Sequence, residues 1–197
     1  MKDVVNFLFE VGMLKKTPRT GYQFLGSGRE SVADHSFRTA IIGYILARRE
    51  SGVDPLKTTL MCLFHDLPEA RTGDHNYVNK RYVQVDEEGA LRDLAAKLPF
   101  GGEIISLVNE FNNGDSLEAS IARDADQIDL IVELKEQKDL GNRYAQEWLG
   151  YALKRLNTQS AQEMAREVLN TDSTEWWFEK KSDWWVNGPQ NNQHRKK

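Results

Sequence analysis

An all-α fold is the class that this sequence predicts, and two observations predict it. Apolar residues recur at the i, i+3, i+4, i+7 spacing that lines one face of a helix, as in Val4, Phe7, Leu8, Val11 and Leu14. The strict alternation of apolar and polar residues that marks a half-buried strand is missing, and no Asn-Gly turn lies between two alternating segments. We therefore expect helices and no sheet.

Several helices carry start signals. Ser31 is suited to N-cap a helix, and Asp34 stands three residues on, close to a capping box. Asp54 and Pro55 supply an N-cap and a first-turn proline for the next helix. A glycine-rich loop precedes Ser31. Together with the apolar periodicity, these signals predict helices at about 3–15, 31–49, from 54 onward, 86–98, 102–112, 116–139, 143–156, 159–170 and, briefly, within 173–187.

Pro68 interrupts an otherwise apolar helical segment, LFHDLPEA. A proline inside a helix removes one hydrogen bond and clashes with the carbonyl four residues earlier. The helix must therefore kink, or end and restart, near Leu67. This interruption lies beside the densest group of potential metal ligands in the sequence.

The length of 197 residues suits one domain, which we expect over 1–180, followed by an aromatic and polar tail at 181–197. The net charge of −4 argues against sequence-independent binding to a nucleic acid polymer, which needs a basic face. The single cysteine, Cys62, excludes an internal disulfide and a cysteine-cluster zinc site. Its apolar neighbours predict a buried, inert thiol rather than a nucleophile.

No apolar run is long enough to span a membrane. The N-terminal apolar stretch is interrupted by Asp3, Asn6 and Glu10, and no small-residue cleavage site follows it, so a signal peptide is not indicated. We expect a cytoplasmic protein without a membrane partner. Neither a phosphate-binding GxxxxGK[ST] loop nor a GxSxG nucleophile motif occurs.

Two histidines and two aspartates are candidate metal ligands. His65 and Asp66 follow an apolar stretch, where an unpaired carboxylate would be costly to bury. Taken alone, this pair favours a helix end that turns into solvent, because a dipeptide is weak evidence for a site. His35 lies at the start of the preceding helix, and Asp126 falls beside the apolar stripe of the 116–139 helix, where a salt bridge with Arg123 is the alternative.

These four side chains would make a mixed nitrogen and oxygen site drawn from three helices. Such a ligand set suits Mn, Fe, Co, Ni or Zn better than Ca. Four protein ligands can leave coordination positions open, as a catalytic metal requires. Glu69 and Asp74, which follow in HDLPEARTGD, are candidates for general acid and base. The alternatives are a solvent-facing Glu69 and an Asp74 that only caps the next segment.

Four separated motifs carry a resemblance to a known family: PRTGY at 18–22, ESVADHSFR at 30–38, LFHDLPEARTGD at 63–74 and RDADQID at 123–129. In this order and spacing the sequence resembles the HD-domain metal-dependent phosphohydrolases, and most closely the HD-domain 5′-deoxynucleotidases. The resemblance implies an all-α helical bundle of the HD-domain type and, commonly, a homodimer.

The resemblance also implies roles for individual residues. His35, His65, Asp66 and Asp126 would be the metal ligands, and Glu69 and Asp74 would be the catalytic carboxylates. Arg19 would hold the substrate phosphate, with Arg29 and Lys80 as competing candidates. One departure follows the GD dipeptide, where this chain reads HNYVNKRY. His75 is therefore an extra polar group that could contact a base or sugar, or point into water.

The function implied is removal of the 5′-phosphate from (deoxy)nucleoside monophosphates, with a divalent transition metal (Co, Mn, Zn, Ni or Fe) as cofactor. The alternatives are an HD phosphohydrolase acting on a triphosphate or cyclic nucleotide, and a non-catalytic module that binds metal and nucleotide. The presence of Glu69 and Asp74 counts against the non-catalytic module, because metal binding alone does not need them.

Trp176, Trp177, Trp184 and Trp185 crowd a short C-terminal stretch. We expect a terminal helix whose aromatic residues pin it onto the core. A subunit interface is the functional alternative, since tryptophan is enriched at interfaces. A membrane-surface helix is disfavoured by the acidic residues within 175–183.

Overall fold

The computed structural model describes residues 1–179 and 181–188, and within them the regular elements are helices joined by turns and loops. No strand occurs in these residues, where the one extended pairing is an isolated bridge between Pro18 and Ser31. The all-α prediction is confirmed.

The α-helices have the following bounds: α1 Lys2–Val11, α2 Tyr22–Leu25, α3 Val32–Ala47, α4 Pro55–Phe64, α5 Glu69–Thr72, α6 Glu87–Ala95, α7 Gly101–Asn113, α8 Leu117–Asp139, α9 Arg143–Ala152, α10 Gln159–Asn170 and α11 Trp184–Asn187. Short 3-10 helices span Gly12–Lys15, Asn79–Arg81 and Leu153–Arg155.

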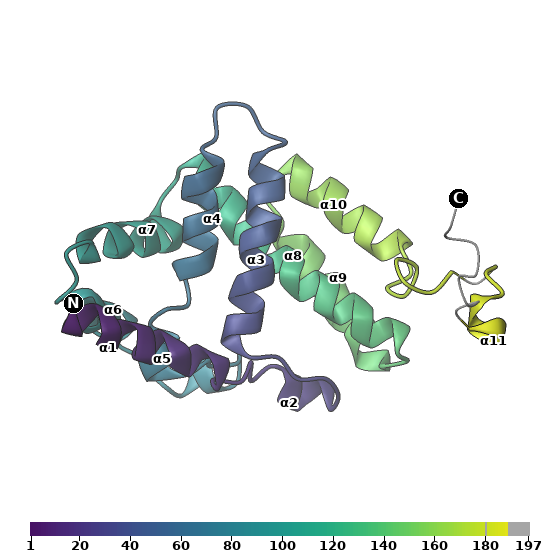
Figure 1. The fold of residues 1–197 in the computed structure, drawn as a ribbon, viewed down its shortest axis with the longest axis horizontal. Coiled ribbons are helices and arrows are strands. Elements are labelled where there is room, and N and C mark those ends of the chain that lie inside the picture. Colours follow the sequence, from purple (N-terminus) through teal and green to yellow (C-terminus); the bar gives the residue numbers. More distant parts are fainter. Residues whose placement is uncertain (180, 189–197) are drawn as a thin grey trace, which may run out of the picture.

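Helix α8 is the central element (Figure 1) and packs against α3, α4, α9 and α10. Its residues Ile121, Ile128, Ile131 and Leu134 are fully buried in the main core. A second, smaller core joins α1, α6 and α7 to the start of α3. The bundle thus surrounds the one long helix that carries Asp126.

The capping signals act as predicted. Ser31 and Asp34 form a reciprocal capping box at the start of α3, and the side chain of Asp54 accepts two backbone hydrogen bonds at the start of α4. Pro68 causes the interruption expected from the sequence, because α4 ends at Phe64 and α5 restarts at Glu69. The turn between them carries the His-Asp pair. The short helix α2, within the glycine-rich loop, was not predicted.

The prediction for the C-terminal tryptophans was wrong in its main point. The four rings lie outside both cores, and Trp176 is 86% exposed. Trp177, Phe178 and Trp185 contact one another, Trp184 contacts Trp185, and α11 lies apart from the bundle (Figure 1). Aromatic residues here satisfy each other locally instead of reaching the core. The division at residue 180 stays a prediction, and residues 189–197 of the expected tail lie outside the described residues.

Candidate active site

Three helices bring four side chains to one point. His35 comes from the first turn of α3, His65 and Asp66 from the turn after α4, and Asp126 from the middle of α8. His35 Nε2 lies 3.4 Å from His65 Nε2, 3.2 Å from Asp126 Oδ1 and 3.6 Å from Asp66 Oδ2. His65 Nε2 lies 3.2 Å from Asp66 Oδ2 and 4.0 Å from Asp126 Oδ1.

The outer ring nitrogens fix the tautomer of both histidines. His35 Nδ1 lies 2.6 Å from Asp129 Oδ2, and His65 Nδ1 lies 2.8 Å from the carbonyl oxygen of Cys62. Both partners accept hydrogen bonds, so each Nδ1 carries a proton and donates it. Such an outer hydrogen bond accompanies almost every histidine that binds a metal.

The four inward-facing groups fit a divalent metal. With Nδ1 turned outwards, each Nε2 faces two carboxylates, an arrangement that positive charge between them stabilises and that a divalent metal can supply. Metal bonds of about 2.0–2.2 Å place neighbouring ligand atoms about 2.8–3.6 Å apart. Four of the five measured separations fall in that range, between 3.2 and 3.6 Å.

The pKa values reflect the same demand for positive charge. Burial and Arg19 lower the pKa of His35, but its contacts with Asp126 and Asp129 outweigh them and raise it to about 10. Burial raises the pKa of Asp126, but the hydrogen bond and charge of His35 reduce it to about 2. The salt bridge between Asp126 and Arg123 does not form, because Arg123 donates instead to the carbonyls of Phe111 and Gly114.

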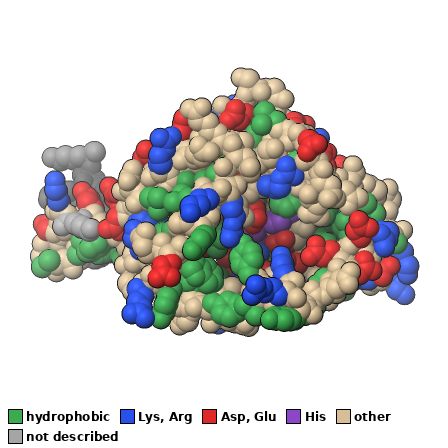
Figure 2. All heavy atoms as spheres, turned by 180° about the vertical axis from the view of Figure 1, so that it is seen from behind, with side chains coloured by type: hydrophobic (Ala, Val, Ile, Leu, Met, Phe, Trp, Pro, Cys, Tyr) green, Lys and Arg blue, Asp and Glu red, His purple; other side chains and the backbone are tan. Residues whose placement is uncertain are grey.

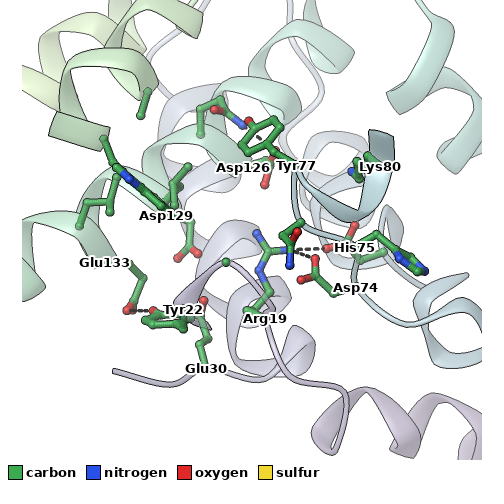
Figure 3. A pocket seen from close by; sticks show the side chains of 18 of the residues that line it. Arg19, Tyr22, Glu30, Asp74, His75, Tyr77, Lys80, Asp126, Asp129 and Glu133 are labelled. Atoms are coloured by element: carbon green, nitrogen blue, oxygen red, sulfur yellow. Dashed lines mark hydrogen bonds and ion pairs between the residues drawn. The ribbon is translucent and has the colours of Figure 1, made fainter. Parts of the chain in front are cut away.

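Arg19 lies against this group and links it to Asp74. Its Nη1 is 3.4 Å from Asp66 Oδ2 and 3.5 Å from Asp74 Oδ1, and Figure 3 shows Arg19 and Asp74 pointing towards one another. Asp74 also accepts hydrogen bonds from the backbone N–H and hydroxyl of Thr20, at 2.5 and 2.8 Å. Asp74 is therefore committed to holding the 18–22 loop in place.

Glu69, at the start of α5, differs from Asp74 in having a free oxygen. Its Oε2 is buried and has no hydrogen-bond partner. Burial, followed by the negative charges of Asp66 and Asp74, raises the pKa of Glu69 well above its usual range. A buried carboxyl group with an elevated pKa beside a metal site is a candidate for proton transfer.

A cavity of about 680 Å³ opens from this site and has aromatic walls formed by residues that include Tyr22, Phe111, Trp148 and Tyr151. Figure 2 shows a histidine side chain within a hollow bordered by acidic and basic residues. Lys80 and His75 also line the cavity, and His75 Nε2 is 3.1 Å from the Thr72 carbonyl oxygen. Arg29 does not line this cavity; it is exposed and borders a smaller groove nearby.

A family model described as "HD domain" matches residues 11–168. This chain belongs to the HD-domain family.

The relatives of this HD-domain chain include the 5′-deoxynucleotidase HDDC2 of Bos taurus, which is 30% identical over 148 residues, covering 72% of this chain and 71% of the relative. The HDDC2 of Dictyostelium discoideum is also 30% identical, over 69% of this chain and 78% of the relative. Among solved structures, a conserved hypothetical protein from Pyrococcus furiosus superposes with a TM-score of 0.73 at 30% identity, covering 85% and 99% of the two chains.

Sequence reasoning missed the residues that lie behind the candidate metal ligands. Asp129 lies within the RDADQID motif, one helical turn beyond Asp126, but its bond to His35 depends on how α3 and α8 pack. Arg38 stands one turn after His35, and its contact with Asp129 depends on the same packing of α3 against α8. The only sequence signal is spacing, since Asp129, Glu133 and Glu136 share one face of α8.

Proposed function

We propose that this chain is a metal-dependent phosphohydrolase that removes the 5′-phosphate from (deoxy)nucleoside monophosphates. The observation that carries the proposal is the convergence of His35, His65, Asp66 and Asp126 beside Arg19, at the base of a cavity of about 680 Å³. A volume of this size is ordinary for a small-molecule site. The relatives named 5′-deoxynucleotidase support the choice of substrate.

His35, His65, Asp66 and Asp126 would hold a divalent transition metal, for which we propose Co, Mn, Zn, Ni or Fe. Such an ion polarises a phosphoryl oxygen and lowers the pKa of water from about 15.7 towards about 7. Asp129 and the Cys62 carbonyl keep the two imidazoles turned so that their Nε2 lone pairs face inwards.

Arg19 and Lys80 would neutralise the charge of the phosphate. Burial lowers the pKa of Arg19, but Asp66, Asp126 and Asp74 raise it well above its ordinary value, so the guanidinium stays charged. Lys80 lines the cavity from an exposed position and is free to approach a ligand. Positive groups aimed at the phosphoryl oxygens stabilise the charge that develops there during transfer.

Glu69 would hold or move a proton during hydrolysis, since its Oε2 is buried and uncommitted. Asp74 would mainly hold the 18–22 loop, and with it Arg19, in position, because its oxygens already bind Thr20 and Arg19. The aromatic walls, including Tyr22, Trp148 and Tyr151, would exclude water and pack against the nucleoside.

The test is phosphate release from metal-stripped full-length protein, with deoxy- and ribonucleoside monophosphates and added Co, Mn, Mg or Zn. Release that requires metal and is lost in Asp66→Ala is the expected result. Asp115→Ala is the matched control, because Asp115 is exposed and does not line the cavity. Folded, metal-loaded protein that releases no phosphate from any monophosphate would contradict the proposal, and a triphosphate or cyclic nucleotide panel would then be tried.

We also propose a cytoplasmic homodimer. Support for the dimer comes from an exposed apolar stripe on α3, formed by Phe37, Ile41, Tyr44 and Ile45. Analytical ultracentrifugation of the full chain tests it, and a monomer at micromolar concentration would contradict it. Within the described residues, no helix is both long enough and apolar enough to cross a membrane.

A further inference from the structure

One arginine lies directly behind the candidate metal site. Arg38 stands on α3 one turn after His35 and reaches across to α8. Its Nε donates to Asp129 Oδ1, its Nη2 to Glu133, and its Nη1 to Glu136 at 3.3 Å. A single guanidinium therefore binds three carboxylates spaced along one face of α8.

Asp129 connects this arginine to a metal ligand. One of its oxygens accepts from Arg38, and the other accepts from His35 Nδ1 at 2.6 Å. Its side chain is 1% exposed, so no water shell can replace either partner. A carboxylate buried to this degree is costly to leave without a cation and hydrogen bonds.

We propose that Arg38 and Asp129 are positioning residues that hold His35 ready to bind the metal. Arg38 keeps Asp129 pointed at His35, and Asp129 accepts the hydrogen bond from His35 Nδ1 and so sets the direction of Nε2. This inference rests on the metal site of the proposed function and deepens it. It assigns metal affinity to two residues that do not touch the metal.

The planar guanidinium explains why the position holds an arginine. It donates hydrogen bonds to Asp129 through Nε and to Glu133 through Nη2 at the same time, in fixed relative directions. The ammonium group of a lysine is a compact charge on a flexible stem and cannot reproduce this fork. Removing a residue that hydrogen-bonds to a metal ligand typically weakens metal affinity by about 10–100-fold.

The experiment measures Co²⁺ binding to the metal-stripped full-length chain, without nucleotide, by calorimetry and by the visible absorption of bound Co²⁺. Asp129→Asn is expected to weaken binding about 10–100-fold and to change the Co²⁺ spectrum. Arg38→Lys is expected to weaken it about 10-fold. Glu136→Gln is the matched control, because this more exposed carboxylate also binds Arg38 but does not reach His35. Its affinity should match the unmodified chain.

Circular dichroism establishes that each variant is folded. Co²⁺ affinity within twofold of the unmodified chain for folded Asp129→Asn would overturn the proposal. If Asp129→Asn does not fold, Arg38→Lys decides, and equal affinities for Arg38→Lys and Glu136→Gln would overturn it. Failure of the unmodified chain to bind Co²⁺ would instead contradict the metal site itself. Metal binding without phosphate release would contradict the proposed substrate and leave this inference standing.

Discussion

Two aspartates on helix α8, Asp124 and Asp126, have different roles although they are the same residue type. They stand two positions apart, so their side chains leave the helix on opposite sides. Asp124 is fully buried and accepts hydrogen bonds from the backbone and side chains of Asn157 and Thr158, at 2.7–3.2 Å. It fastens the turn that leads into α10.

Asp126 faces the cavity and is far less satisfied. Gln127 Nε2 donates to it at 2.9 Å, and its other oxygen faces the Nε2 atoms of His35 and His65. The difference lies in the donors each carboxylate meets: Asp124 has enough within the chain, and Asp126 requires a cation from outside. We expect substitutions to separate the two into a residue for stability and a residue for function.

The largest effect is expected from Asp126→Ala. Loss of a general acid or base costs roughly 10²–10⁴-fold in rate. Removing one of the four proposed metal ligands should reduce phosphate release by more than that. The free energy of unfolding should change by less than about 1 kcal/mol, because the substitution also relieves crowded negative charge. Initial rates with saturating metal and a urea titration measure both. A large loss of stability with little loss of rate would reverse the roles given to the two aspartates.

Glu69→Gln should have the second largest effect. The amide keeps the shape of the side chain but cannot exchange a proton, so kcat should fall by about 10²–10⁴-fold. Metal affinity should stay within about threefold, since Glu69 is not among the four proposed ligands. Glu88→Gln is the control, because Glu88 is exposed and lies outside the cavity. A parallel loss of metal affinity would move Glu69 from proton transfer to metal binding.

Asp124→Ala tests the other side of the comparison. It leaves two backbone N–H groups and two side-chain donors without their acceptor, and the expected loss of stability is about 2–4 kcal/mol. Phosphate release per folded molecule should be unchanged. Urea unfolding, combined with rates corrected for the folded fraction, separates the two quantities. A rate defect in fully folded protein would show that Asp124 also shapes the site.

The sequence predicts this molecule best where the determinant is local. The Ser31 and Asp54 caps and the break at Pro68 follow from a few neighbouring residues, and all three occur as expected. The proposed ligands could be found because an ordered motif set carries them. Residues whose role depends on packing between distant helices, such as Asp129 and Asp124, could not be told from ordinary surface charges. The prediction for the C-terminal tryptophans failed for a different reason: Trp177, Trp184 and Trp185 pack within their own segment instead of against the core.

The smallest effect is expected at Cys62, which has a backbone carbonyl that contacts the candidate site and a side chain that belongs to the core. Its carbonyl orients His65, and its thiol is fully buried against α8, 3.9 Å from the Ala122 carbonyl oxygen. Burial raises the pKa of the Cys62 thiol well above its usual range, so the thiolate needed for reaction is scarce. Because the folded state favours the neutral thiol, this contribution to stability is complete below the ordinary thiol pKa of about 8.5 and declines as pH rises above it. A thiol-specific disulfide reagent at pH 8 should therefore label no cysteine in the native chain and one in urea. Rapid labelling of folded, active protein would show that α4 opens beside His65, and the site would then be less rigid than its buried contacts indicate.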